Sequence, residues 1–342
     1  MEDKTKKVSI VIPCRNEEKY IGKCIESMIN QSYGIENIEV LVVDGMSDDK
    51  TQEIIKSYSE KQPNVKLVIN EKKVAPVAMN LGIKQAIGDI IIIFGAHAYM
   101  DKDYVKNSVE KLKDDAVAVV GGRIINISEN NLSEAISYAM SSPFGVGNAL
   151  FRYSTKEEFV DTVAFGAYKK EVFETVGLFD EEFVRNQDDE LNFRVSKAGY
   201  KMLLSPSVES HYYTRGSLGK LFKQYYQYGF WKVRLIQKHK RPPAVRHLIP
   251  VMFVSGIILG CLVSIFSELL RGMFLSVLAL YVVLAGVYAF KACNKKYSYI
   301  PRIMICFLIL HSSYGLGFLE GLYTFYLTKN YDRINKNTKM SR

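Results

Sequence analysis

The sequence lacks the features of a secreted, disulfide-stabilised or zinc-binding protein. Its 342 residues include only five cysteines, an odd number, and none forms a CxxC pair with another. Three of the five lie in or beside apolar segments, so the pattern argues against a disulfide framework and a structural zinc site. The amino end, MEDKTKKVSI, has no apolar signal region. We therefore expect the first 240 or so residues to stay in the cytosol.

Two common phosphate-binding motifs are also missing. No GxGxxG follows the first apolar run, and no GxxxxGK[ST] occurs in the chain. These absences count against a dinucleotide-dependent dehydrogenase and a P-loop ATPase. They also weaken the alternative of a nucleotidyltransferase, which would need a glycine-rich, basic phosphate loop after the first strand.

Acidic residues are absent from one long stretch of a chain whose net charge is +9. Residues 211–247 contain no Asp or Glu but nine Lys and Arg. Beside a membrane segment this cluster favours anionic lipid by roughly 1 kcal/mol per residue, and nucleic acid is the poorer alternative. Apolar residues at helical spacing in 217–236 predict an amphipathic interfacial helix, with an ordinary core helix as the alternative.

Charged residues nearly vanish from 248 to 327. Segment 248–270 carries one charge, Glu268, and segment 273–290 carries none. At about 1.5 Å per residue, each can cross or nearly cross a hydrocarbon core of about 30 Å. Segment 303–327 is a third candidate, although it contains His311 and Glu320.

The charges that flank these segments leave the membrane topology open. Basic residues occur at 238–246, at 291–302 and in the tail, 328–342. All three would prefer the cytosol, and three full crossings cannot satisfy that preference. Either the third segment re-enters or lies at the interface, or the tail is outside despite its charge.

The first 95 or so residues alternate apolar runs with segments of helical periodicity. The runs lie at 7–13, 38–43, 65–69 and 89–94. This order predicts right-handed crossovers and a doubly wound, mostly parallel α/β sheet. Ligands bind outside the carboxyl ends of such strands, so the polar residues there are candidates for a site. Asp44 and His97 can equally be read as turn residues.

Several ordered motifs resemble the family 2 glycosyltransferases with the GT-A fold. They are VSIVIPCRNEE at 8–18, LVVDGMSDDKT at 41–51, NLGIKQAIGDIIIIFGAHA at 80–98, VAFGAYKKEVFETVGLFDEEF at 163–183 and RNQDDELNFRVSKAGYK at 185–201. The subgroup with the greatest likeness contains succinoglycan-type exopolysaccharide enzymes, and the resemblance covers roughly residues 6–235. It implies a cytosolic GT-A domain over 1–210, with a nucleotide-binding half (1–98) and an acceptor half (99–210). A basic interfacial segment (211–247) and a membrane region (248–327) follow.

The resemblance also implies an activity. It is the inverting transfer of one sugar from a nucleotide-diphosphate sugar, UDP-hexose by family habit, to a polyprenyl-diphosphate-linked glycan. The enzyme would be a multi-pass protein of the plasma membrane, with anionic lipids and no nucleic acid as partners. Residues 227–231, QYGFW, lack the Arg of the QxxRW motif that processive members carry. This favours single-sugar transfer.

Site residues follow from the same resemblance. Asp188 aligns with the catalytic base, which takes the proton of the acceptor hydroxyl. It begins an expected helix over 188–198. The nucleotide sugar is assigned to Pro13, Arg15, Glu17, Asp44, Asn80, Asp89 and Gly95. The acceptor is assigned to Gly166, Ala167, Asp189 and Glu190.

The chain departs from the family at the metal-binding Asp-x-Asp motif, where it has Gly95-Ala96-His97. Neutral imidazole suits Mn²⁺ better than Mg²⁺. We therefore expect a divalent ion, Mn²⁺ rather than Mg²⁺, held by His97, His211 and the diphosphate. In one alternative, Lys and Arg side chains neutralise the diphosphate without metal. In another, the chain is a non-catalytic GT-A assembly partner.

Overall fold

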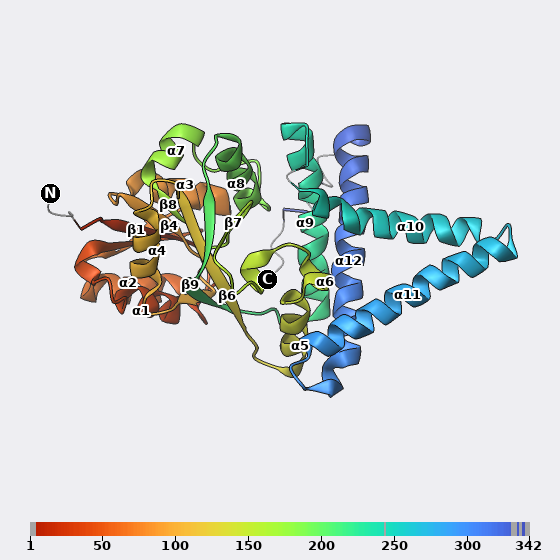
Figure 1. The fold of residues 1–342 in the computed structure, drawn as a ribbon. Helices are drawn as coiled ribbons and strands as arrows, with labels where there is room; N and C mark the ends of the chain where they lie inside the picture. Colours follow the sequence, from red (N-terminus) through yellow and green to blue (C-terminus); the bar gives the residue numbers. More distant parts are fainter. Residues whose placement is uncertain (1–4, 243, 330–333, 335–336, 339–342) are drawn as a thin grey trace. The chain divides into compact units, whose positions relative to one another are not determined.

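The computed structural model describes residues 5–242, 244–329, 334 and 337–338, which form two units (Figure 1). The first unit comprises residues up to 126 together with 150–213, and the second comprises 127–149 and the chain from 214 onward. Residues 127–149 therefore leave the predicted acceptor half and join the second unit. The predicted basic tail, 328–342, falls largely outside the described residues.

The first unit begins with four parallel strands in the order β3-β2-β1-β4. They are β1 (Val8–Cys14), β2 (Ile38–Asp44), β3 (Val65–Ile69) and β4 (Ile90–Ile93). The crossovers contain α1 (Ile21–Ile29), α2 (Thr51–Lys61) and α3 (Ala75–Gln85). Val8 pairs with both Ile38 and Ile90, so the carboxyl ends of β1, β2 and β4 lie at one edge of the sheet.

The rest of the sheet is antiparallel. Here β8 (Ala167–Lys169) pairs with β4 and with β6 (Val119–Ile127), while β9 (Met202–Tyr213) pairs with β5 (Ala98–Met100) and β7 (Glu158–Val160). Three helices accompany these strands: α4 (Tyr104–Leu112), α7 (Lys170–Val176) and α8 (Gln187–Lys197). The prediction of a mostly parallel sheet holds for the first half only. Strands of three residues, such as β5, β7 and β8, carry too little periodicity to predict their direction.

The core of the first unit lies on both faces of the sheet. Ile10 and Ile12 of β1 join one apolar cluster, which contains residues of α1, and Val11 joins another, which contains residues of α3. All three are fully buried, as expected for a parallel strand covered by helices on both sides.

The second unit is helical. It consists of α5 (Asn131–Met140), α6 (Pro143–Val146), α9 (Leu218–His239), α10 (Ile249–Val263), α11 (Glu268–Ala292) and α12 (Ile300–Leu322), which continues as a π-helical segment, Tyr323–Thr328. Segments Val245–Val263, Glu268–Ala292 and Tyr297–Thr328 are long and apolar enough to cross a membrane. The first predicted span, 248–270, is too long, because the helix ends at Val263 and Glu268 begins the next one.

Candidate active site

The carboxyl ends of β1 and β2 form a rigid polar corner around Asp44. Asp44 is fully buried, and one of its carboxylate oxygens accepts from the Ser47 backbone N–H at 2.9 Å and from Gln52 Nε2 at 2.7 Å. The other oxygen accepts from the Ser47 hydroxyl and from Cys14 Sγ. All four lone-pair positions of the carboxylate are thus occupied. Asp44 holds the loop after β2, and sequence reasoning missed Ser47 and Gln52 as its partners.

Arg15 offers an unused hydrogen-bond donor in the same corner. Its Nε is buried and has no hydrogen-bond partner among the described residues. Its side chain packs beside Gly45, directly after Asp44. A buried donor without a partner is unfavourable unless a ligand or water satisfies it. Pro13, half-buried, pairs with Val43 just before this corner.

Glu17 and His97 meet at the same edge of the sheet. His97 Nδ1 lies 3.3 Å from Glu17 Oε1, and the Glu17 backbone N–H donates to Thr51 Oγ1 at 2.8 Å. The His97 side chain is 25% exposed. This pair brings an imidazole and a carboxylate, both metal-binding groups, to the edge where a ligand is expected.

His211 and His97 pack against different aromatic rings. It pairs with Tyr99 across β5 and β9, and its ring stacks on the Tyr99 ring at 4.6 Å. His97 instead contacts the ring of Tyr212, whose side chain points to the opposite face of β9 from that of His211. These ring contacts give no support to an ion shared by His97 and His211, and that ion stays a prediction.

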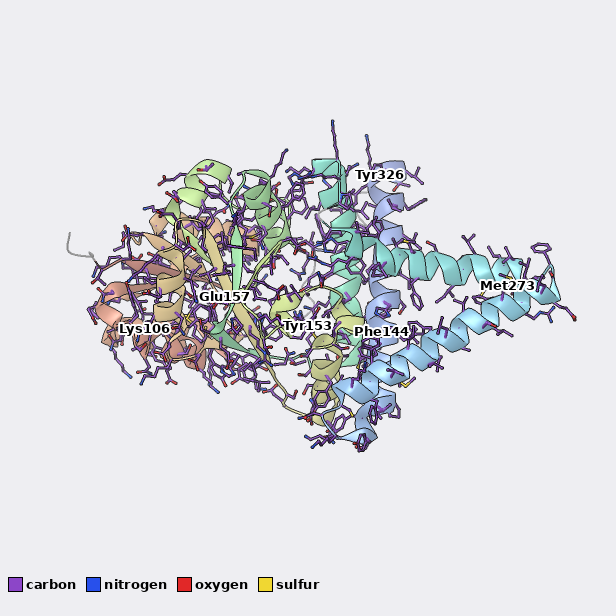
Figure 2. All side chains as sticks on the ribbon, viewed as in Figure 1. Lys106, Phe144, Tyr153, Glu157, Met273 and Tyr326 are labelled. Atoms are coloured by element: carbon purple, nitrogen blue, oxygen red, sulfur yellow. The ribbon has the colours of Figure 1, made fainter. Side chains whose placement is uncertain are left out.

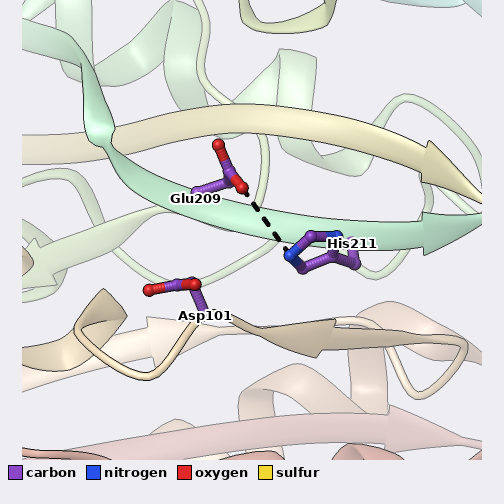
Figure 3. Close-up of side chains that lie close together, drawn as sticks. All are labelled: Asp101, Glu209 and His211. Carbon is purple, nitrogen blue, oxygen red and sulfur yellow. Dashed lines mark ion pairs between the residues drawn. The ribbon is translucent and has the colours of Figure 1, made fainter.

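His211 belongs to a different group of side chains, with Asp101 and Glu209 (Figure 3). The ligand atoms of these three residues lie within 4.8 Å of one another, and His211 Nε2 is 3.7 Å from Glu209 Oε1. Among the described residues, no group of this kind contains His97. Exposed carboxylates of this sort commonly occur without a metal, and we assign them no role in the reaction.

A loop before β8 covers Gly95. The Ile93 backbone N–H donates to the Gly166 carbonyl at 3.1 Å, and Ala167 pairs with Ile92. The Phe165 ring lies 4.5 Å from that of Phe94, and a Cβ added to Gly95 would lie 2.9 Å from it. The structure therefore brings Gly166 and Ala167 to the strand end that carries Gly95. Phe165, which has a positive φ of 51°, was not among the predicted site residues.

Asp188 lies exposed in the first turn of α8, where the sequence predicts a helix start. One turn later, Asn192 Nδ2 donates to Thr162 Oγ1 at 2.9 Å, and Asn192 Oδ1 accepts from the Tyr168 hydroxyl. Burial, and to a lesser extent the charge of Asp188, raises the pKa of Tyr168. These contacts hold the helix that carries Asp188 against the loop that covers Gly95. Asp189 follows directly and donates its backbone N–H to Asp188 Oδ1 at 3.0 Å.

Three predicted site residues have structural roles instead. Glu190 is buried and paired with Arg194. Asn80 is buried and exchanges hydrogen bonds with the backbone of Phe179. Asp89 accepts from the backbone N–H of Lys7 at the amino ends of β4 and β1. Because that is the opposite edge of the sheet from Gly95, Asp89 is excluded from the nucleotide site.

The fold places the chain in a known structural class. A mannosyltransferase from Pyrobaculum calidifontis, solved with GDP-Man and Mn²⁺, superposes with a TM-score of 0.63 over 94% of this chain and 88% of that one. The two sequences are 20% identical, so this likeness shows the fold alone. The protein has the GT-A fold of glycosyltransferases.

Sequence comparison then shows the family. Residues 9–177 match the model of glycosyl transferase family 2. A Methanococcus voltae protein, named dolichyl N-acetyl-alpha-D-glucosaminyl phosphate 3-beta-D-2,3-diacetamido-2,3-dideoxy-beta-D-glucuronosyltransferase, is 37% identical over 92% of this chain and 97% of its own length. Succinoglycan biosynthesis protein ExoA of Rhizobium meliloti is 28% identical over 92% and 95%. The chain belongs to glycosyl transferase family 2 and is a glycosyltransferase.

Proposed function

We propose that this glycosyltransferase moves a single sugar, with inversion, from a UDP-hexose to a lipid-linked oligosaccharide in the synthesis of a cell-surface glycan or exopolysaccharide. The observation that carries the proposal is the likeness to the Methanococcus voltae enzyme, which extends over nearly the whole chain, including its apolar helices. The name of that enzyme describes transfer to a dolichyl-phosphate-linked sugar. The likeness to a succinoglycan biosynthesis protein supports the same class of product.

Asp188 is the proposed catalytic base. An inverting transfer needs one carboxylate that takes the proton of the acceptor hydroxyl as the sugar leaves its diphosphate. The Asp188 side chain is exposed, and Asn192 fixes its helix to Thr162. Asp189, Gly166 and Ala167 remain proposed acceptor contacts beside it.

The donor is proposed to bind at the carboxyl edge of β1, β2 and β4. The Arg15 Nε–H has no hydrogen-bond partner among the described residues, and the oxygens of a nucleotide diphosphate accept hydrogen bonds of this kind. Pro13, Glu17, Gly95 and the loop held by Asp44 complete the proposed contacts. A divalent ion, when bound, supplies a positive charge to the leaving diphosphate. His97 and Glu17 are the residues that would hold it, and their nitrogen and oxygen donors favour Mn²⁺ over Mg²⁺.

The proposal is tested by measuring UDP release from a panel of UDP-hexoses by the full chain in native membranes. We expect Asp188→Asn to lose roughly 10²- to 10⁴-fold in rate while it still binds UDP. Glu174→Gln, which removes an exposed charge on α7 away from the proposed site, is the control and should keep the wild-type rate. If both variants release UDP at the wild-type rate, Asp188 is not the base.

The same assay addresses the non-catalytic alternative and the metal. A wild-type chain that binds UDP but never releases it from any UDP-sugar would support an assembly partner. Binding of Mn²⁺ to the full chain with UDP can be followed by electron paramagnetic resonance, without any turnover. We expect His97→Ala to weaken this binding and His211→Ala to leave it unchanged.

A further inference from the structure

Helices α9 and α12 lie side by side and run in the same direction (Figure 1). A Cβ added to Gly317 would overlap the carbonyl oxygen of Tyr226, and one added to Gly321 would lie 2.7 Å from that of Phe230. Farther along, Gln237 Nε2 donates to the Phe325 carbonyl at 3.0 Å. Residue numbers increase together along the two helices, so the pairing is parallel and extends over most of α9.

This pairing means that α12 cannot enter a bilayer without α9. On the same alignment, Lys220 and Lys223 of α9 lie level with the middle of α12, and both are exposed. Arg234 and Lys238 follow near its end. Charged side chains at the centre of a bilayer are strongly unfavourable, so Lys220 and Lys223 make a crossing by the α9–α12 pair untenable.

Helices α10 and α11 have the opposite character. Only 6% of the most apolar stretch of α10 and 11% of that of α11 is buried, against 44% for α12. They project as a hairpin from the α9–α12 pair and approach each other near Gly260 and Phe274. Met273, at the far end of the hairpin, is 59% exposed (Figure 2). Surfaces this apolar and this exposed need lipid around them.

An apolar stripe remains uncovered on α12. It consists of exposed residues at helical spacing, Ile305, Leu308, Leu316, Leu322 and Tyr326. The α9–α12 pair thus exposes lysines on α9 and an apolar stripe on α12. An amphipathic surface of this kind lies in the plane of the headgroup boundary, with its apolar side toward the acyl chains. Tyr326 is the kind of residue that prefers this depth.

We propose that the chain crosses the bilayer twice, through α10 and α11, and that the α9–α12 pair lies along the headgroup boundary of an anionic leaflet. This inference rests on the membrane location in the proposed function. Two crossings return the chain to its starting side. The basic segments that flank the α10–α11 hairpin, at 238–246 and 291–302, then lie on one side of the bilayer together with Thr328, as the positive-inside rule favours.

The proposal is tested by cysteine labelling of the full chain in sealed vesicles of known orientation, with a membrane-impermeant maleimide. Cys261 is replaced by Ser in the parent, because the four other cysteines are buried. Single cysteines are introduced at four exposed positions, Lys56, Phe266, Lys295 and Thr328. We expect Lys56→Cys, Lys295→Cys and Thr328→Cys to label from one side and Phe266→Cys from the other.

Two outcomes would overturn the proposal. Labelling of Thr328→Cys from the same side as Phe266→Cys would show that α12 crosses. Labelling of all four from one side would show that nothing crosses. The labelling pattern does not depend on sugar transfer, so we expect the same pattern in an Asp188→Asn background, where transfer is lost. A failure of the proposed function therefore leaves the labelling result intact, and a failed labelling test leaves the proposed function intact.

The depth of α12 has a test of its own. A bimane fluorophore on Leu316→Cys should be quenched by lipids brominated near the headgroup, whereas one on Lys223→Cys should not. Equal quenching at both positions, or strongest quenching of Leu316→Cys by lipids brominated at the chain ends, would contradict a surface position.

Discussion

Replacement of Glu190 by Gln separates a structural role from the acceptor-binding role that the sequence suggests. Glu190 is 1% exposed, and its carboxylate accepts from Arg194 Nε at 2.9 Å and from Nη2 at 2.7 Å. The same guanidinium donates to the carbonyl of Leu178 at 2.8 Å and to that of Val176. Glu190 therefore fixes α8 to the loop after α7 through Arg194.

The expected loss can be worked out from this geometry. Gln keeps the size of the side chain but leaves the guanidinium without a countercharge, and removal of one partner from a buried ion pair costs about 3–5 kcal/mol. Because the Arg194 side chain is 21% exposed, we take the lower end, about 3 kcal/mol. For a unit of this size each kcal/mol lowers Tm by roughly 2–4 °C, so we expect a decrease of roughly 6–12 °C.

The measurement is thermal unfolding of the full chain in detergent, monitored by the exposure of the buried Cys24 thiol. Glu174→Gln, an exposed change on α7, is the matched control and should leave Tm within about 1 °C. The double change Glu190→Leu with Arg194→Met should recover most of the loss, because a buried pair can be replaced by apolar side chains. An unchanged Tm together with a raised KM for the acceptor would refute the structural role.

Three further predictions concern other parts of the molecule. Burial alone would raise the pKa of Glu39, but hydrogen bonds from Lys66, Ser9 and the Ile87 N–H lower it overall. The stability that the Glu39 carboxylate contributes to the folded chain is complete above its unfolded-state pKa, near 4.3, and is lost as pH falls through the lower folded-state pKa. Glu39→Gln should therefore flatten the acid side of a Tm-against-pH curve, and an unaltered slope would contradict this. Gly317→Val should separate α9 from α12 and expose α9 to protease, whereas Gly219→Ala, where a Cβ meets nothing within 4 Å, should not. Burial raises the pKa of the Cys14 thiol well above its usual value, so mass spectrometry should find Cys14 unalkylated by iodoacetamide at pH 8 in the folded chain, and rapid alkylation would argue against the buried corner at Asp44.

Much of the fold was predictable because local patterns carry it. Alternation of apolar runs with helical periodicity predicted the parallel half of the sheet, and the carboxyl ends of its strands marked where Glu17 and His97 meet. The acidic start of α8 and the apolar segments after residue 248 were equally visible. In each case residues close together in the sequence are sufficient for the prediction, because their spacing defines which side of a helix or strand is apolar and where that helix or strand ends.

Relations between distant segments were decided only by the tertiary structure. The pairing of β5 with β9 puts His211 opposite Tyr99 and on the other face from Tyr212, against which His97 packs. Glu190 is a buried ion-pair partner because α8 lies on the loop after α7. The basic helix α9 pairs with α12 through close approach at Gly317. Register, strand direction and helix partners depend on contacts between residues far apart in the chain, and no local periodicity encodes them.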